Sequence, residues 1–249
     1  MKRLLKCIQA VYSIYAMLIF ILLLLVIFPF VLLASFFGKI KGGNIIYRIC
    51  SLWCDAWFFF IAVWAKKIKQ TSAPEKTSQY IFIANHISYM DVPMIVKVIR
   101  QPLRALGKAE LVRVPLFGLL YRYGAIMVDR SDPEKRKKSV LQLKSVLRKG
   151  ISVFIFPEGT FNTSGNPLKE FYDGAFRIAI ETQTALLPVI FPDTIKRLHY
   201  SNILSFSPGK CRAIFLKELP VEGLSIDDLP VLKESIFKMM EDALKVYRM

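Results

Sequence analysis

Ala10–Phe37 is a run of 28 residues without a charged side chain, and this run limits what the chain can fold into. A helix needs about 20 apolar residues to cross the hydrocarbon core of a bilayer, so the run is long enough to span a membrane. A secretory signal peptide has a shorter apolar core and a small-residue cleavage site, and neither is evident here. We therefore expect the segment to be retained as a helix in contact with lipid.

A second apolar run, Cys50–Ala65, has 16 residues and contains Asp55. Its tryptophans, Trp53, Trp57 and Trp64, are of the type that settles at a bilayer interface. Two arrangements are open: both helices cross the membrane as a hairpin with cytoplasmic ends, or both lie partly in one leaflet as a monotopic anchor. The short second run favours the monotopic arrangement.

The chain combines high apolarity with a strong positive charge. Of its residues, 54% are apolar, the mean hydropathy is +0.40 and the formal net charge is +16. Nine basic residues in positions 1–70 flank the apolar runs, against the single acidic residue Asp55. Positive charges beside membrane segments favour an anionic leaflet as the partner, and this placement argues against nucleic acid, the other acidic partner.

The cysteines and histidines do not indicate a metal site. The four cysteines have no metal-ligand spacing, and the chain holds only two histidines. The cysteine pattern also does not suggest a disulfide framework, so we expect a reducing, cytoplasm-facing compartment. The cysteines are Cys7, Cys50, Cys54 and Cys211.

Residues 70–249 alternate between short apolar runs and amphipathic stretches, which predicts βα units. Such units build a largely parallel sheet covered by helices, an α/β fold whose ligands gather at the carboxyl ends of the strands. We expect a two-helix membrane motif at 1–69 and an α/β domain at 70–249. The predicted strands are Tyr80–Ala84, Leu103–Gly107, Ala125–Val128, Ser152–Phe156, Leu186–Phe191 and Arg212–Leu216. The predicted helices are Pro93–Val98, Val114–Tyr123, Lys135–Lys149, Tyr172–Glu181 and Asp228–Tyr247.

The stretch IANHISYMD brings Asn85 and His86 to the end of a predicted strand. Asp91 follows two residues before Pro93, which is a favourable helix start. Across a strand–turn–helix junction the carboxylate can accept one imidazole N–H, which leaves the other ring nitrogen as a proton acceptor. Taken alone, the spacing also fits a capped helix beside an ordinary polar turn residue.

Two further predicted strands end in polar residues at the same edge. In IMVDRSD, Arg130 is suited to grip a phosphate, or else it pairs with a neighbouring aspartate at the surface. In FPEGT, Glu158, Gly159 and Thr160 follow a strand, where glycine permits close ligand approach; a plain β-turn is the alternative.

Together these stretches resemble the glycerolipid acyltransferase family, that of the 1-acylglycerol-3-phosphate acyltransferases. Asn85-His86 with Asp91 matches the family's NHxxxxD block, and Gly124–Arg130 matches its second block. Phe156–Thr160 and Leu187–Ile190 match the third and fourth. Each block alone is weak, but all four occur in the family's order within residues 78–192.

The resemblance implies transfer of a fatty acyl group from acyl-CoA or acyl carrier protein to the free sn-2 hydroxyl of 1-acylglycerol-3-phosphate, giving phosphatidic acid. His86 would be the general base and Asp91 its orienter. The predicted substrate-binding residues are Asn85, Lys108, Arg130, Glu158, Gly159 and Thr160. No metal or other cofactor is required, and the catalytic domain is expected at the cytoplasmic face of a membrane, the inner membrane if the source is bacterial.

The chain departs from the family at one informative position. The third block usually continues FPEGTRS, but here Phe161 and Asn162 replace the arginine and the serine. Lys169 or Lys108 is a candidate to supply the lost charge. Alternatively the acceptor is another lysolipid, such as a lyso-aminolipid.

Other mechanisms also remain open at this stage. Ser88 is a conceivable nucleophile, although no GxSxG elbow surrounds it. A hydrolase that activates water with His86, and a non-catalytic lipid-binding scaffold, are the remaining alternatives.

Overall fold

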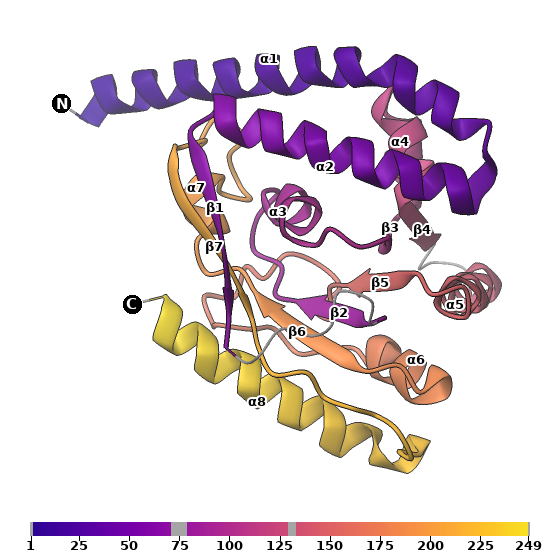
Figure 1. Ribbon diagram of the computed structural model, residues 1–249. Helices are drawn as coiled ribbons and strands as arrows, with labels where there is room; N and C mark the ends of the chain where they lie inside the picture. Colours follow the sequence, from indigo (N-terminus) through magenta and orange to yellow (C-terminus); the bar gives the residue numbers. More distant parts are fainter. Residues whose placement is uncertain (1, 71–78, 129–132, 249) are drawn as a thin grey trace.

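Seven strands form one mixed sheet in the computed structural model, which describes residues 2–70, 79–128 and 133–248 (Figure 1). The strand order is β1-β7-β6-β2-β5-β3-β4. Among the described residues, every neighbouring pair is parallel except β6 with β7. The predicted largely parallel α/β sheet is therefore confirmed. The strands are β1 Val63–Lys69, β2 Ile81–Ala84, β3 Leu103–Lys108, β4 Ala125–Val128, β5 Ser152–Ile155, β6 Leu186–Ile190 and β7 Gly209–Phe215.

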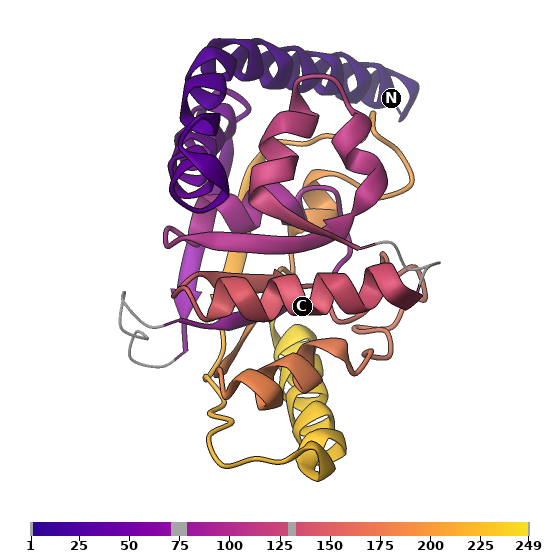
Figure 2. The same cartoon turned by 90° about the vertical axis from the view of Figure 1, so that its right-hand side faces the viewer.

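Helices cover both faces of the sheet, as Figures 1 and 2 show. Helices α2 and α3 pack on one face, with α1 outside α2, and α6 and α8 pack on the other. The α-helices are α1 Lys2–Ser35, α2 Gly43–Phe60, α3 Asp91–Val98, α4 Phe117–Gly124, α5 Pro133–Leu147, α6 Gly174–Thr182, α7 Thr194–Arg197 and α8 Leu229–Tyr247. Short π or 3₁₀ segments are Gly38–Gly42, Ala109–Arg113 and Ile226–Asp228.

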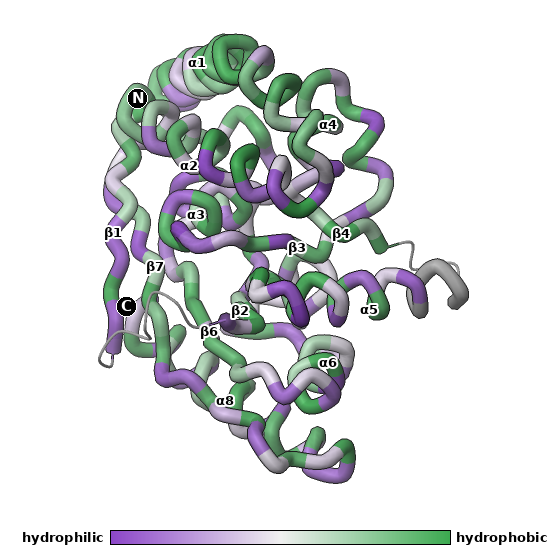
Figure 3. Tube along the Cα trace, turned by 45° about the vertical axis from the view of Figure 1, so that its right-hand side comes forward, coloured by the Kyte–Doolittle hydropathy of each residue, from purple (hydrophilic) through white to green (hydrophobic). Residues whose placement is uncertain are grey.

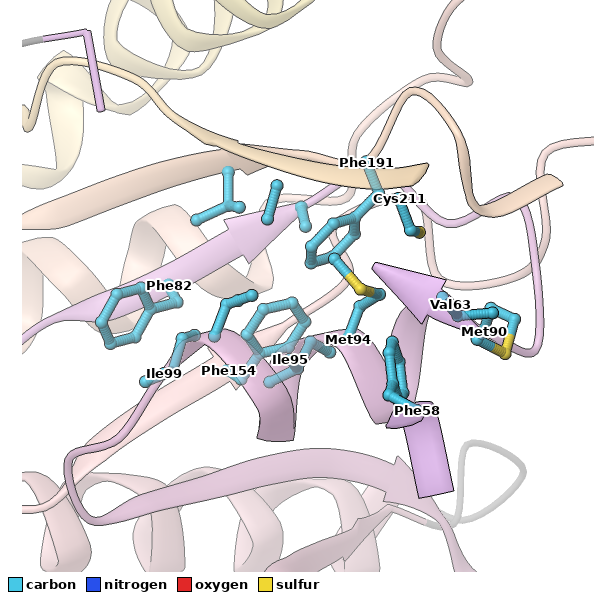
Figure 4. Close-up of a cluster of buried hydrophobic side chains, with 14 of the residues drawn as sticks. Phe58, Val63, Phe82, Met90, Met94, Ile95, Ile99, Phe154, Phe191 and Cys211 are labelled. Carbon is cyan, nitrogen blue, oxygen red and sulfur yellow. The ribbon is translucent and has the colours of Figure 1, made fainter. Parts of the chain in front are cut away.

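The central strands are buried on both faces, and apart from Ser152 at the start of β5 their side chains are apolar. Every residue of β2, β5 and β6 is buried, as expected for parallel strands covered by helices. Figure 4 shows the cluster on the α3 face, where Met94 lies beside Phe191 and Met90 lies beside Val63. This cluster supports the segment that runs from β2 into α3.

The N-terminal region differs from the sequence prediction at its second half. We expected Cys50–Ala65 to form the second apolar helix, but α2 begins at Gly43 and ends at Phe60, and Val63–Lys69 then forms β1. β1 pairs in parallel with β7, so the sheet reaches back into the range that we assigned to the membrane motif. The division into 1–69 and 70–249 otherwise stays a prediction.

The expected interfacial position of the tryptophans is wrong for two of the three. Trp53 and Trp57 are buried, and Trp57 Nε1 donates a hydrogen bond to the carbonyl of Ala16 at 2.9 Å. The reason is that α2 lies between α1 and the α/β domain, which buries its aromatic face. Trp64, on β1, is exposed.

Helix α1 lies along the rest of the protein. Ser13 accepts a hydrogen bond from the backbone N–H of Phe206, and near the other end the Tyr123 hydroxyl donates to the carbonyl of Ser35. Exposed apolar side chains occur along α1 from Leu4 to Leu33, and much of this helix is green in Figure 3. Among the described residues, Arg3–Ser35 is the one helix long and apolar enough to cross a membrane.

Candidate active site

The structure brings His86 and Asp91 together at the carboxyl end of β2. His86 Nδ1 lies 2.9 Å from Asp91 Oδ2, and Asp91 is the first residue of α3. The same oxygen accepts the backbone N–H groups of Ile87 at 2.8 Å and Ser88 at 2.9 Å. Three donors on one buried carboxylate oxygen fix the turn between β2 and α3. With Asp91 accepting, Nδ1 carries the hydrogen and Nε2 keeps its lone pair for a substrate.

Two phenylalanine rings flank the His86 imidazole. Phe156 stacks on it, with ring centroids 3.8 Å apart and an interplanar angle of 13°. Phe161 lies 4.2 Å from the imidazole centroid, tilted by 50°. The His86 side chain keeps 17% of its surface exposed. The ring plane is therefore held by packing as well as by Asp91, while part of the ring remains open.

The aromatic contacts extend outward from Phe161. Its ring centroid lies 4.8 Å from that of Tyr89 and 6.3 Å from that of Tyr200. Phe161 occupies the position of the arginine that usually follows FPEGT in the family. With Tyr89 and Tyr200, it makes the surroundings of His86 aromatic.

Glu158 is buried and holds backbone groups of two segments together. Its Oε1 accepts the N–H of His86 and its Oε2 accepts the N–H of Lys169, each at 2.8 Å. Burial raises the pKa of Glu158 from 4.5 to about 7, although the two backbone hydrogen bonds oppose that rise. The positive charge of Arg248, at the end of α8, also favours the ionised carboxylate. Glu158 thus fixes the backbone of His86, while Asp91 holds its imidazole ring.

Asn85 also binds the backbone. Its side-chain amide donates to the carbonyl of Phe191 at 3.2 Å and accepts the N–H of Phe191 at 2.8 Å. The residue is buried, so this reciprocal pair joins the ends of β2 and β6. We predicted Asn85 and Glu158 as substrate-binding residues; their side chains here position His86, and a role in binding stays a prediction.

Three of the other predicted substrate-binding residues, Gly159, Thr160 and Lys108, follow or end strands β5 and β3. Gly159 has φ of +74°, a left-handed conformation that favours glycine. Thr160 is exposed, and its hydroxyl accepts a hydrogen bond from Lys169 Nζ at 3.0 Å. Lys108 is exposed at the end of β3, and Arg130 lies outside the described residues.

Ser88 is not placed to act as a nucleophile. Its hydroxyl donates to the carbonyl of Leu198 at 2.5 Å and accepts the N–H of Met90 at 3.0 Å, and the residue is fully buried. A nucleophile must reach the acyl carbon, so this geometry disfavours an acyl-enzyme at Ser88.

Sequence reasoning singled out Phe161 but missed Phe156 and Tyr200 as parts of the aromatic surroundings of the imidazole. Phe156 belongs to the FPEGT stretch, and its place at a strand end was a usable signal. Tyr200 lies more than a hundred positions from His86 along the chain, and no local pattern indicated it. In the described part of the chain, no three side chains of His, Cys, Asp or Glu group as metal ligands would.

A family model described as acyltransferase matches residues 66–192, the region that contains the site. The chain belongs to the acyltransferase family. The 1-acyl-sn-glycerol-3-phosphate acyltransferase alpha of Mus musculus is 30% identical over 166 residues, which is 64% of this chain and 56% of that protein. The 1-acyl-sn-glycerol-3-phosphate acyltransferase of Haemophilus influenzae is 29% identical over 169 residues, 67% of this chain and 69% of that protein.

A solved structure has the same fold. The crystal structure of the 1-acyl-sn-glycerophosphate (LPA) acyltransferase PlsC from Thermotoga maritima aligns with a TM-score of 0.74 at 19% identity. The alignment covers 98% of this chain and 97% of that one. By contrast, the match spans only a little over half the length of the mammalian relatives.

Proposed function

We propose that this protein transfers a fatty acyl group from acyl-CoA or acyl carrier protein to the sn-2 hydroxyl of 1-acylglycerol-3-phosphate, giving phosphatidic acid. The names of the mouse and Haemophilus relatives support this acceptor. The contact between His86 Nδ1 and Asp91 Oδ2 is the observation that carries the proposal, because it leaves Nε2 as a base.

The chemistry needs one base and an activated donor. His86 Nε2 takes the proton from the acceptor hydroxyl as its oxygen attacks the thioester carbonyl. The new C–O bond forms a tetrahedral intermediate, which collapses by breaking the C–S bond. The thiolate leaves and receives the proton from the imidazolium, so no other cofactor enters the balance. Asp91 stabilises the imidazolium while it exists.

A different acceptor headgroup is the second candidate. The observation that favours it is the position of Phe161, whose ring lies 4.2 Å from the imidazole where the family has a cation. An aromatic ring cannot bind phosphate as a guanidinium does. Under this alternative the chemistry at His86 is unchanged, and a lysolipid with another headgroup is the substrate.

A panel of lysolipids tests both candidates with three forms of the protein: wild type, Phe161→Arg and Phe161→Leu. If wild type prefers 1-acylglycerol-3-phosphate, the main proposal holds. If it prefers an aminolipid and Phe161→Arg raises the relative kcat/KM for the phosphate acceptor about tenfold or more, the alternative holds. Phe161→Leu removes the ring without adding charge and so separates the two effects. An unchanged preference in Phe161→Arg would show that this position does not select the headgroup.

We also propose that the protein sits on the cytoplasmic face of a membrane with α1 in one leaflet. A helix rises about 1.5 Å per residue, so the contacts at Ser13 and Ser35 lie roughly 33 Å apart along α1, more than the thickness of a bilayer core. Because both contacts are made to the same α/β domain, a transmembrane path for α1 would carry part of that domain into lipid. The exposed apolar side chains of α1 support the monotopic arrangement.

A further inference from the structure

The loop of residues 199–206 lies between the candidate active site and the N-terminal half of α1. On the α1 side, Gln9 Nε2 donates to the carbonyl of Ser205 at 3.1 Å, and the N–H of Phe206 donates to Ser13 Oγ at 3.0 Å. The Phe206 ring packs edge-on against Trp57 of α2, with centroids 5.9 Å apart. Figures 1 and 2 both show the orange segment before β7 beside α1. The 199–206 loop is therefore fixed to the proposed membrane helix.

The other side of the 199–206 loop reaches the surroundings of His86. Tyr200 lies 6.3 Å from Phe161, and Phe161 lies 4.2 Å from His86, both measured between ring centroids. Just before the loop, the carbonyl of Leu198 accepts the Ser88 hydroxyl from the turn between β2 and α3. Aromatic contacts thus connect the imidazole to the 199–206 loop.

The middle of the 199–206 loop presents apolar side chains to the outside. Ile203 is 56% exposed and Leu204 is 40% exposed. On α1, Leu5 is 59% exposed and lies one helical turn before Gln9, on the helix face that meets the loop. The exposed apolar surface of the loop therefore adjoins that of α1.

The charges around this apolar surface suit an anionic lipid surface. The chain has no acidic residue from position 194 to 217, and none from position 1 to 54. The exposed basic residues that flank the two apolar segments are Arg3, Lys6, Lys196 and Lys210. Basic residues near anionic headgroups strengthen membrane binding by electrostatic attraction.

We propose that the 199–206 loop enters the same leaflet as α1 and that the lysolipid acceptor reaches His86 from the leaflet along this loop and Phe161. The proposal rests on the proposed function for the identity of the acceptor. It adds a second lipid-binding element, contributed by a segment far from the N-terminus in sequence. The acyl chain of the acceptor would stay in apolar surroundings on its way from the leaflet to the imidazole.

Vesicles of phosphatidylcholine and phosphatidylglycerol that carry doxyl-labelled lipid test the membrane contact. In the full chain with Cys7→Ser, a fluorophore is attached to Ile203→Cys, to Val11→Cys on α1 as a positive control, or to Val231→Cys on α8. Val231 is 74% exposed, and α8 lies on the opposite side of the molecule from α1. We expect doxyl quenching at positions 11 and 203 and none at 231. Quenching at 11 but not at 203 would overturn the proposal and leave the proposed function untouched.

Activity provides the second measurement. The double variant Ile203→Asp/Leu204→Asp is compared with Val231→Asp, using a long-chain acceptor in vesicles and a short-chain acceptor in solution. We expect the fold-loss in kcat/KM of the double variant to be at least about tenfold greater for the vesicle acceptor than for the soluble one. Val231→Asp should keep its kcat/KM toward both acceptors. Equal losses toward both acceptors would mean that the loop only shapes the site, which contradicts the proposed lipid route.

Discussion

Asp91 fixes both the tautomer and the orientation of His86, so its charge matters more to the chemistry than its volume. In Asp91→Asn the amide either loses the Nδ1–H hydrogen bond or turns an N–H group toward the imidazole. We expect kcat to fall by about 10²–10⁴-fold, the range typical of a general base. The matched control is Ser88→Ala, which removes a neighbouring buried hydroxyl and should cost about 1 kcal/mol of stability with kcat within tenfold of wild type. A loss of kcat in Ser88→Ala as large as that in Asp91→Asn would instead support Ser88 as the nucleophile.

Glu158 makes stability depend on pH in a defined window. The pKa of Glu158 is about 7 in the fold, against a usual value of 4.5. Between pH 4.5 and 7 the folded state therefore keeps Glu158 protonated while the unfolded state ionises it. The free energy of unfolding therefore decreases as pH rises from 4.5 to 7, by up to about 3 kcal/mol in total from this group. Glu158→Gln cannot ionise at this position. Its free energy of unfolding, measured with urea from pH 4.5 to 8, should therefore lack this decrease with pH. Identical slopes in the variant and wild type would contradict the buried, titrating carboxylate.

At the scale of elements, Arg104 connects the turn between α1 and α2 to β3. It is buried, and its Nη2 donates to the carbonyl of Lys39 at 3.1 Å and to Asn44 Oδ1 at 2.9 Å. A Cβ added at Gly43 would lie 2.4 Å from the same Nη2, so glycine is needed for this close approach. Burial lowers the pKa of Arg104 to about 10, which still leaves it charged at neutral pH.

Arg104→Met should destabilise the protein by about 2–4 kcal/mol, because it removes the charged hydrogen bonds that the buried guanidinium makes to the partly buried acceptors of the turn. The matched control is Arg100→Met. Arg100 is about half exposed and pairs with Asp55 at the surface, so its loss should cost at most about 1 kcal/mol. Urea unfolding of both variants measures the difference. Equal small effects would show that Arg104 does not hold the α1–α2 turn to the sheet.

The sequence predicted most elements of the α/β domain but missed β1. Strands β2, β4, β5 and β6 coincide with short, mainly apolar runs bounded by polar residues, a local pattern that is visible in the sequence. Val63–Lys69 instead continues an apolar helix and contains three lysines, and its partner β7 lies about 145 positions away in the chain. Long-range pairing of this kind leaves no local pattern.

The candidate site was predictable to a similar degree. The spacing of His86 and Asp91 allowed their contact but also fitted a plain capped helix, so the prediction of the pair rested on the resemblance carried by all four blocks. The positioning roles of Asn85 and Glu158 depend on backbone groups of Phe191 and Lys169, which the fold brings near. Only the three-dimensional structure can supply such partners.

At the scale of the whole molecule, the N-terminal helices are packed as part of the domain. The Tyr47 hydroxyl of α2 donates to the carbonyl of Ile99 at 2.8 Å, and α1 contacts the 199–206 loop. Under the proposed membrane arrangement, with α1 lying in one leaflet, this packing would hold His86 close to the leaflet that contains the lipid substrate. In the vesicle experiment, a label on α1 that doxyl lipids do not quench would contradict this arrangement.

The most direct test of the central claim uses purified protein, a labelled acyl thioester and 1-acylglycerol-3-phosphate, with other lysolipids as alternative acceptors. We predict labelled phosphatidic acid, or the diacyl product of a preferred lysolipid, and a fall in rate of about 10²–10⁴-fold in His86→Ala. Two results would contradict the account. One is the absence of transfer to any acceptor, including release of free fatty acid alone, which would indicate a scaffold or a hydrolase. The other is transfer that His86→Ala leaves unchanged.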